Sequence, residues 1–144
     1  MKVNGTVEKK VNKEKIVFVP MACDFIHEGH LNIIKKASKY GKVTIGLLTD
    51  EAIAVYKPIP TFSFNQRHKV IKAVKGVSAV EKTEDWDYAS ALERIKPDFV
   101  VHGDDWKSNN QKQVRRNVIS QLRTWKGKLI EIPYTKGISS SDIK

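Results

Sequence analysis

Short apolar runs rich in β-branched residues alternate along this chain with longer segments whose apolar residues recur at helical spacing. The first three such segments are residues 15–20, 30–41 and 43–48. The two short runs predict buried strands, and the periodic segment between them predicts a helix. Strand, helix and strand in so short a stretch form a βαβ unit, whose strands are parallel and joined by a right-handed crossover.

The same alternation continues along the rest of the chain. Further strands are expected at 77–80, 98–102 and 128–132, and further helices at 50–56, 63–76, 85–96 and 114–127. This pattern predicts an α/β fold: a doubly wound, Rossmann-like parallel sheet of five strands with helices on both faces. Ligands of such sheets bind beyond the carboxyl ends of the strands, so the loops at 21–30 and 103–107 are expected on one ligand-binding edge.

Length and composition exclude several classes of protein. The 144 residues suffice for one domain, expected at 15–144 behind a flexible basic arm at 1–14. No apolar run approaches the ~18–20 residues of a membrane span, and the polar N-terminal stretch lacks the apolar segment of a secretory signal. The single cysteine, Cys23, excludes an internal disulfide and a four-cysteine zinc site. We therefore expect a cytoplasmic protein.

The net charge is +10, from 26 Lys and Arg against 16 Asp and Glu. This excess of positive charge is compatible with a binding partner such as nucleic acid, an anionic membrane or a phosphorylated small molecule. The alternative is that the lysines form a solvated surface without a binding role. Lysines are spread over every predicted helix, and no basic motif is interleaved with aromatic residues. A nucleic-acid-binding module is therefore the non-enzyme alternative and is not favoured, and no membrane partner is expected.

Two histidines, His27 and His30, flank Gly29 where the first predicted strand leads into the first predicted helix. A helix N-terminus presents free N–H groups that bind anions, and a glycine permits close backbone approach. The histidine spacing differs from the i, i+4 spacing of the zinc-protease motif. Both imidazoles can reach one phosphate from the first turn; the alternative is that they are surface or capping residues.

Three motifs carry a resemblance to a known family: Asp-Phe-Ile-His-Glu-Gly-His at 24–30, Gly-Asp-Asp-Trp at 103–106 and Gly-Ile-Ser-Ser-Ser at 137–141. In this order they resemble the HxGH nucleotidylyltransferases, in particular the glycerol-3-phosphate cytidylyltransferase-like group. The stretches GLLTDEAIA at 46–54 and PYTKGISSS at 133–141 look most similar to the nucleotidyltransferase domain that is fused to phosphoenolpyruvate mutase in phosphonate biosynthesis.

The resemblance implies that an acceptor phosphate or phosphonate oxygen attacks the α-phosphorus of CTP in line, that pyrophosphate leaves, and that no covalent enzyme intermediate forms. It assigns catalytic roles to His27 and His30, as hydrogen-bond donors to the reacting phosphates, and to Lys57. Magnesium would be held mainly by the nucleotide phosphates, so no protein metal ligand is named.

The resemblance also implies the binding residues. Those expected to bind the nucleotide are Asp24, Gly29, Gly103, Asp104, Asp105, Trp106, Ile138, Ser139, Ser140 and Ser141, with the Asp105 carboxylate accepting from the amino group of cytosine. Lys57 and Arg67 are expected to bind the acceptor. The structural alternatives are turns or caps for the aspartates and serines, packing for Trp106 and a solvated Lys57. His102 is set aside as a strand-end residue.

The chain departs from the glycerol-3-phosphate enzymes at two places. Residues 75–80 replace their RYVDEV stretch, and Tyr134 stands where their RTEGIS segment has arginine, with Lys136 as a substitute charge. These differences disfavour glycerol 3-phosphate and favour a small phosphonate, with 2-hydroxyethylphosphonate as the best guess. A glycerol-3-phosphate cytidylyltransferase and an ATP-dependent adenylyltransferase are the enzyme alternatives.

The serine segment begins a helix too short to be stable alone, which suggests that the natural polypeptide continues. The resemblance leaves room for a homodimer and for a fused phosphoenolpyruvate mutase domain.

Overall fold

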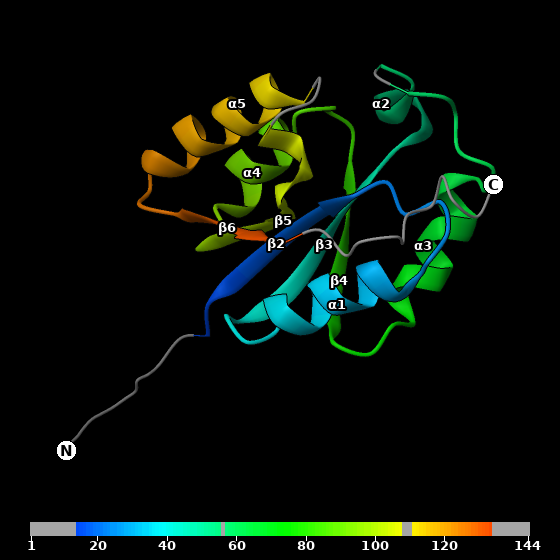
Figure 1. Ribbon diagram of the computed structural model, residues 1–144, viewed down its shortest axis with the longest axis horizontal. Helices are drawn as coiled ribbons and strands as arrows, with labels where there is room; N and C mark the ends of the chain where they lie inside the picture. Colours follow the sequence, from blue (N-terminus) through cyan, green and yellow to red (C-terminus); the bar gives the residue numbers. More distant parts are fainter. Residues whose placement is uncertain (1–13, 56, 108–110, 134–144) are drawn as a thin grey trace.

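The computed structural model describes residues 14–55, 57–107 and 111–133 (Figure 1). Its elements follow one another as the alternating pattern predicts. They are β2 (Ile16–Met21), α1 (Glu28–Ala37), β3 (Lys42–Leu48), α2 (Asp50–Ala54), α3 (Phe64–Lys72), β4 (Val77–Thr83), α4 (Ala89–Ile95), β5 (Phe99–Gly103), the 3-10 turn η1 (Asp104–Lys107), α5 (Lys112–Arg123) and β6 (Lys128–Ile132).

The five strands form one sheet in the order β4-β3-β2-β5-β6, and every neighbouring pair is parallel. The described part of the chain therefore begins in the middle of the sheet, builds outward through β3 and β4, and then returns to add β5 on the other side of β2. The predicted doubly wound, five-stranded parallel sheet is confirmed. The order reverses between β2 and β5, which makes this pair the topological switch point of the sheet.

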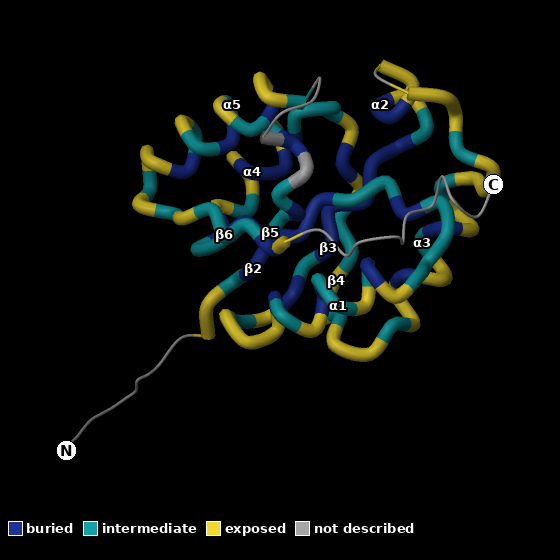
Figure 2. The backbone as a smooth tube through the Cα atoms, in the orientation of Figure 1, coloured by how far each residue is buried: buried dark blue, intermediate teal, exposed yellow. Residues whose placement is uncertain are grey.

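Two apolar clusters cover the two faces of the sheet. Along β2, Val17 and Val19 belong to the cluster with α1 and α3, whereas Phe18 belongs to the cluster with α2, α4 and α5. Successive residues of a strand point to opposite faces, so a short run buried on both faces needs apolar residues at every position. Figure 2 shows the buried strands at the centre and the exposed residues on the outer helix surfaces.

Several element boundaries differ from the sequence predictions, and for two of them the structure shows the cause. β4 continues to Thr83 rather than ending at residue 80, because its polar end keeps pairing with β3, with Leu48 opposite the buried Thr83. α4 starts at Ala89 rather than at Asp85, because Tyr88 takes a left-handed conformation with φ 66°. The backbone N–H of Tyr88 donates to the carbonyl of Asp85, so residues 85–88 form a turn before the helix.

Within the described ranges, no helix is long and apolar enough to cross a bilayer. Residues 1–13 of the expected basic arm and all of the serine segment lie outside those ranges.

Candidate active site at the switch point of the sheet

The predicted ligand-binding edge lies where β2 and β5 end side by side. Neighbouring strands are spaced ~4.8 Å apart, so the loops that follow these two strands begin close together. The chain leaves β2 towards α1 on one face of the sheet, and it leaves β5 through η1, whose Trp106 packs on the other face. Connections that diverge in this way open a crevice at the strand ends, which is where α/β sheets bind ligands.

His27 and His30 cap the N-terminus of α1 with their own side chains. The Nδ1 atom of His27 accepts the backbone N–H of Gly29 at 3.0 Å, and the Nδ1 atom of His30 accepts the N–H of His27 at 3.2 Å. The two ring centroids lie 4.1 Å apart. An imidazole nitrogen that accepts carries no proton, so the proton of each neutral ring is on Nε2. The caps thus fix both histidines as Nε2–H donors.

His30 stays neutral over the physiological pH range. Burial, followed by the charges of His27 and Lys57, lowers its pKa from 6.5 to about 4. The side chain of Lys57 is exposed, yet its charge acts on His30. A metal ion at Nε2 would need the lone pair of that nitrogen. The lone pair is available only when the proton sits on Nδ1, and Nδ1 could then no longer accept the capping N–H. The histidine pair therefore suits an anion, and it does not suit a metal.

The low pKa of His30 makes folding depend on pH. The folded pKa lies below that of the unfolded chain, so between pH 6.5 and about 4 the unfolded state binds the extra proton, and the folded state loses stability as the pH falls. His30→Asn retains an acceptor in place of Nδ1 but does not titrate. Urea unfolding at pH 7 and pH 4.5 should show a smaller acid-induced loss of unfolding free energy for this variant than for the parent. An equal loss would contradict the assignment.

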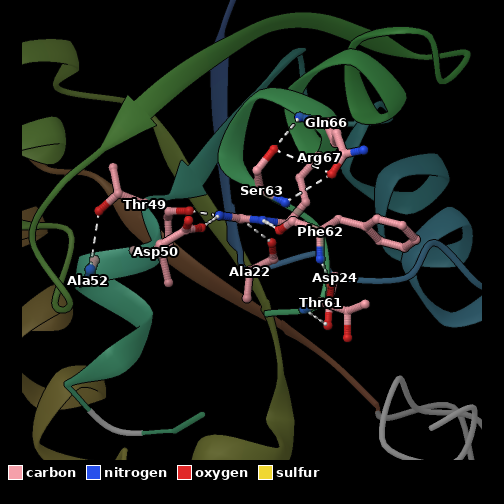
Figure 3. A network of polar contacts seen from close by, with 11 residues as sticks. Ala22, Asp24, Thr49, Asp50, Ala52, Thr61, Phe62, Ser63, Gln66 and Arg67 are labelled. Atoms are coloured by element: carbon pink, nitrogen blue, oxygen red, sulfur yellow. Dashed lines mark hydrogen bonds and ion pairs between the residues drawn. The ribbon is translucent and has the colours of Figure 1, made fainter. Parts of the chain in front are cut away.

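Asp24 connects the histidine loop to the segment that leads into α3. Its carboxylate accepts the backbone N–H groups of Thr61 at 2.9 Å and Phe62 at 3.0 Å (Figure 3). The next residue, Ser63, caps α3 by accepting from the N–H of Gln66. The described contacts therefore give Asp24 a positioning role, by which the loop after β2 and the start of α3 hold each other in place.

Arg67 is buried, with 2% of its surface exposed. Its guanidinium donates to the carbonyls of Ala22 at 2.7 Å, Leu48 at 2.9 Å and Phe62 at 3.1 Å, and to the Asp50 carboxylate at 2.6 Å (Figure 3). These contacts give Arg67 a structural role, and its predicted contact with the acceptor remains a prediction. The side chain fastens the histidine loop, the end of β3 and the start of α2 to α3, and four of its five N–H donors bind protein oxygens.

A mainly apolar groove runs between the loop after β2 and α3. Phe25, Phe62 and Val70 line it, and Asp24 and Arg67 form part of its wall. The rings of Phe25 and Phe62 meet edge to face, 5.4 Å apart. His27 and His30 are not among the lining residues, whereas Ile26, the residue before His27, is.

Trp106 is fully buried in the core rather than exposed to a ligand. Its indole Nε1 donates to Glu131 at 2.7 Å, and Arg115 donates to both oxygens of that carboxylate at 2.8 and 3.0 Å. These contacts give Trp106 a supporting role in the fold, and its expected contact with the nucleotide remains a prediction. Gly103 is buried at the end of β5, and Asp104 is half-buried beside it.

The structure adds one residue that the sequence argument set aside. His102, the next-to-last residue of β5, stacks on Trp106 with ring centroids 3.6 Å apart and planes 3° apart. Its position at the carboxyl end of a buried strand was the available signal, but a single histidine at a strand end is an ambiguous one.

The structure does not describe the side chain of Asp105, nor Ile138, Ser139, Ser140 and Ser141, so their predicted nucleotide contacts remain predictions. In the part of the chain that is described, no group of three or more His, Cys, Asp or Glu residues is placed to hold a metal ion.

Comparison with known proteins supplies the family. Residues 23–144 match the family described as Cytidylyltransferase-like. Ethanolamine-phosphate cytidylyltransferase of Mus musculus is 31% identical over 124 residues, which cover 83% of this chain and 29% of that protein. Bifunctional protein HldE of Methylobacillus flagellatus is 28% identical over 133 residues, which cover 90% of this chain and 26% of that protein. The chain thus spans less than a third of the length of either relative.

The fold has solved counterparts. The lipopolysaccharide core biosynthesis protein from Thermoplasma volcanium GSS1 superposes with a TM-score of 0.74 at 21% sequence identity, over 86% of this chain and 100% of that one. At this identity the likeness bears on the fold, and it agrees with the Rossmann-like sheet described above.

Proposed function

The chain belongs to the Cytidylyltransferase-like family, and from that premise we propose that it transfers a cytidylyl group from CTP to a small acceptor that carries a phosphate or phosphonate. Pyrophosphate is the other product. One observation carries this proposal: His27 and His30 are locked by their caps as a pair of Nε2–H donors at the N-terminus of α1. This pair lies at the switch point of the sheet, where α/β folds bind nucleotides.

In the proposed reaction, an acceptor oxygen attacks the α-phosphorus of CTP in line, a bond to the acceptor forms, and the bond to pyrophosphate breaks. Negative charge grows on the phosphate oxygens in the transition state. Two neutral Nε2–H donors that are already oriented stabilise this charge without having to reorganise, which is worth roughly 3–4 kcal/mol for a donor of this kind. The protons stay on Nε2, and no enzyme group is covalently modified.

The surrounding residues support this geometry. Asp24 and Arg67 fix the loop that carries the histidines, and the ten residues of α1 add the partial positive charge of a helix N-terminus. We place Lys57 at the phosphates, because its charge already acts on His30. Gly103, Asp104 and Asp105 are assigned to the nucleoside, and the segment 138–141 to the triphosphate.

Magnesium fits this site as a partner of the nucleotide. The capped histidines have no lone pair to offer, and a hard cation prefers phosphate oxygens and water, so the nucleotide itself would hold the ion. When bound, the ion neutralises charge on the triphosphate.

The acceptor we propose is a small phosphonate, with 2-hydroxyethylphosphonate as the specific candidate. The replacement of an arginine by Tyr134 and the resemblance to domains of phosphonate biosynthesis support this choice. The guanidinium of Arg67 binds protein oxygens. We therefore assign the contact with the negatively charged group of the acceptor to Lys57. A fused phosphoenolpyruvate mutase domain, a homodimer and a cytoplasmic location belong to the same proposal.

A pyrophosphate-release screen tests the proposal directly. The four ribonucleoside triphosphates are each combined with a panel of phosphonates and phosphomonoesters. We expect the fastest release with CTP and 2-hydroxyethylphosphonate. Faster release with ATP would indicate an adenylyltransferase, and glycerol 3-phosphate outperforming every phosphonate would contradict the acceptor assignment alone. No release with any pair would contradict the enzymatic function.

A further inference from the structure

Helices α1 and α3 cover the same face of the sheet, and their outer surface carries lysines. Ile34 of α1 and Ile71 of α3 are buried in one apolar cluster, and Figure 1 shows both helices on the side of the sheet opposite α4 and α5. We call their outer surface the lysine face. Its exposed cations, on the two helices and the turns that follow them, are Lys35, Lys39, Lys69, Lys72 and Lys75.

The lysine face lacks the carboxylates that would neutralise it. Residues 29–49 and 52–80 contain no Asp or Glu, and Glu28, the first residue of α1, is the one acidic residue of the two helices. Among the described residues, none of the five lysines forms an ion pair. On the other side of the sheet, Lys96 pairs with Glu93 and Arg115 with Glu131, each at 2.8 Å. Like charges that repel one another favour a partner with many negative charges.

Exposed apolar side chains lie among these lysines. Leu31, one turn before Lys35 in α1, is 46% exposed, and Val70, next to Lys69 in α3, is 54% exposed. Val70 and Lys69 also line the apolar groove of about 680 Å³ between α3 and the loop after β2. A surface that combines lysines with exposed apolar side chains is typical of proteins that bind the interface of a bilayer.

The residue types distinguish a membrane from other anionic partners. Arg67, the one arginine of α3, is buried, and α1 has none, so the exposed cations of both helices are lysines. Protein–protein interfaces are enriched in arginine and depleted in lysine. Nucleic acid would bind the lysines but would leave the aliphatic side chains of Leu31 and Val70 without a partner. A bilayer offers phosphates to the lysines and apolar chains to the aliphatic groups.

We propose that the lysine face is a docking surface for a membrane that contains acidic lipids. The lysine ammonium groups bind the headgroup phosphates, and Leu31 and Val70 reach the boundary between headgroups and acyl chains. This inference does not depend on the proposed function. It departs from the expectation of no membrane partner, which considered the lysines helix by helix, whereas the sheet gathers those of α1 and α3 on one side.

Sedimentation of the full chain with lipid vesicles tests the proposal. We expect binding to vesicles of equal parts phosphatidylcholine and phosphatidylglycerol, and little binding to phosphatidylcholine alone. Raising the salt concentration from about 0.1 M to about 1 M should weaken the binding, because the Debye length falls from about 10 Å to about 3 Å. Equal binding to both kinds of vesicle, or binding to neither, overturns the inference.

The triple variant Lys35→Gln/Lys69→Gln/Lys72→Gln removes three charges from the lysine face. Because each lysine near an acidic membrane contributes to its attraction, the partition coefficient onto the acidic vesicles should fall about 100-fold. The three side chains are exposed, so the variant should fold, and thermal unfolding verifies this.

The matched control removes the same charge from the other side of the sheet. Lys112→Gln/Arg116→Gln/Arg123→Gln changes three exposed cations of α5 and should lower the partition coefficient by less than about threefold. An equal fall in the two triple variants overturns the inference, because the net charge rather than the lysine face would then cause the binding.

The aliphatic side chains distinguish the membrane from nucleic acid. Leu31→Ser/Val70→Ser keeps every lysine and should weaken binding to the acidic vesicles about tenfold, because less apolar surface leaves water. Vesicle binding that this variant leaves unchanged overturns the inference. A parent chain that binds single-stranded RNA in a gel shift but does not sediment with the acidic vesicles also overturns it, in favour of a nucleic-acid surface.

Discussion

Replacing His27 or His30 by asparagine should lower turnover about 100- to 1000-fold while the chain stays folded. The asparagine oxygen can accept the same backbone N–H that Nδ1 accepts in the parent, at 3.0 Å for His27 and 3.2 Å for His30, so the cap of α1 is retained. The Nε2–H donor is lost. If these donors act in the transition state, kcat should fall much more than the affinity for CTP.

Glutamine at the same positions is the matched control, because it keeps an N–H near the position of Nε2 and loses the short-range cap. The Gln variants should therefore lose more unfolding free energy than the Asn variants and keep more of the turnover. Pyrophosphate release measures turnover, and urea unfolding measures stability. Near-normal kcat in both Asn variants would contradict the proposed chemistry.

Replacing Arg67 by methionine should destabilise the fold by about 3–5 kcal/mol, a typical cost of removing one partner from a buried charged network. The substitution leaves the carbonyls of Ala22, Leu48 and Phe62 without their donor, and it leaves the Asp50 carboxylate unpaired by Arg67. Lysine is no substitute, because an ammonium group does not have the planar arrangement of donors that reaches all four oxygens.

The control for Arg67 lies on the same helix. Lys69 is exposed and lines the same groove, so Lys69→Met should change the unfolding free energy by less than about 0.5 kcal/mol. Steady-state kinetics distinguish a structural role of Arg67 from the acceptor-binding role that its motif predicts. A weakened Arg67 variant that still folds should lose kcat, because the histidine loop is displaced, and a selective rise in the acceptor KM would restore the acceptor-binding assignment.

The local sequence was sufficient for the element order and for the position of the histidine pair at the start of α1. Buried strands need apolar residues at every position, and the runs at 16–20, 43–48 and 98–102 predict three of them. A histidine pair after the first strand marks the N-terminus of α1, because strand, loop and helix follow one another within a few residues. Side chains that cap a helix act within one turn, so a short window of sequence contains the information.

The tertiary structure decided which side chains reach the crevice. Arg67 and Trp106 were assigned to ligands from their motifs, but Arg67 contacts residues 5 to 45 positions away and Trp106 contacts Glu131, 25 positions away. The sequence alone determined the strand and helix pattern and the turn at His27 that begins α1. Partners brought together by the sheet order β4-β3-β2-β5-β6 determined the rest, because the burial of a side chain depends on neighbours that are distant along the chain.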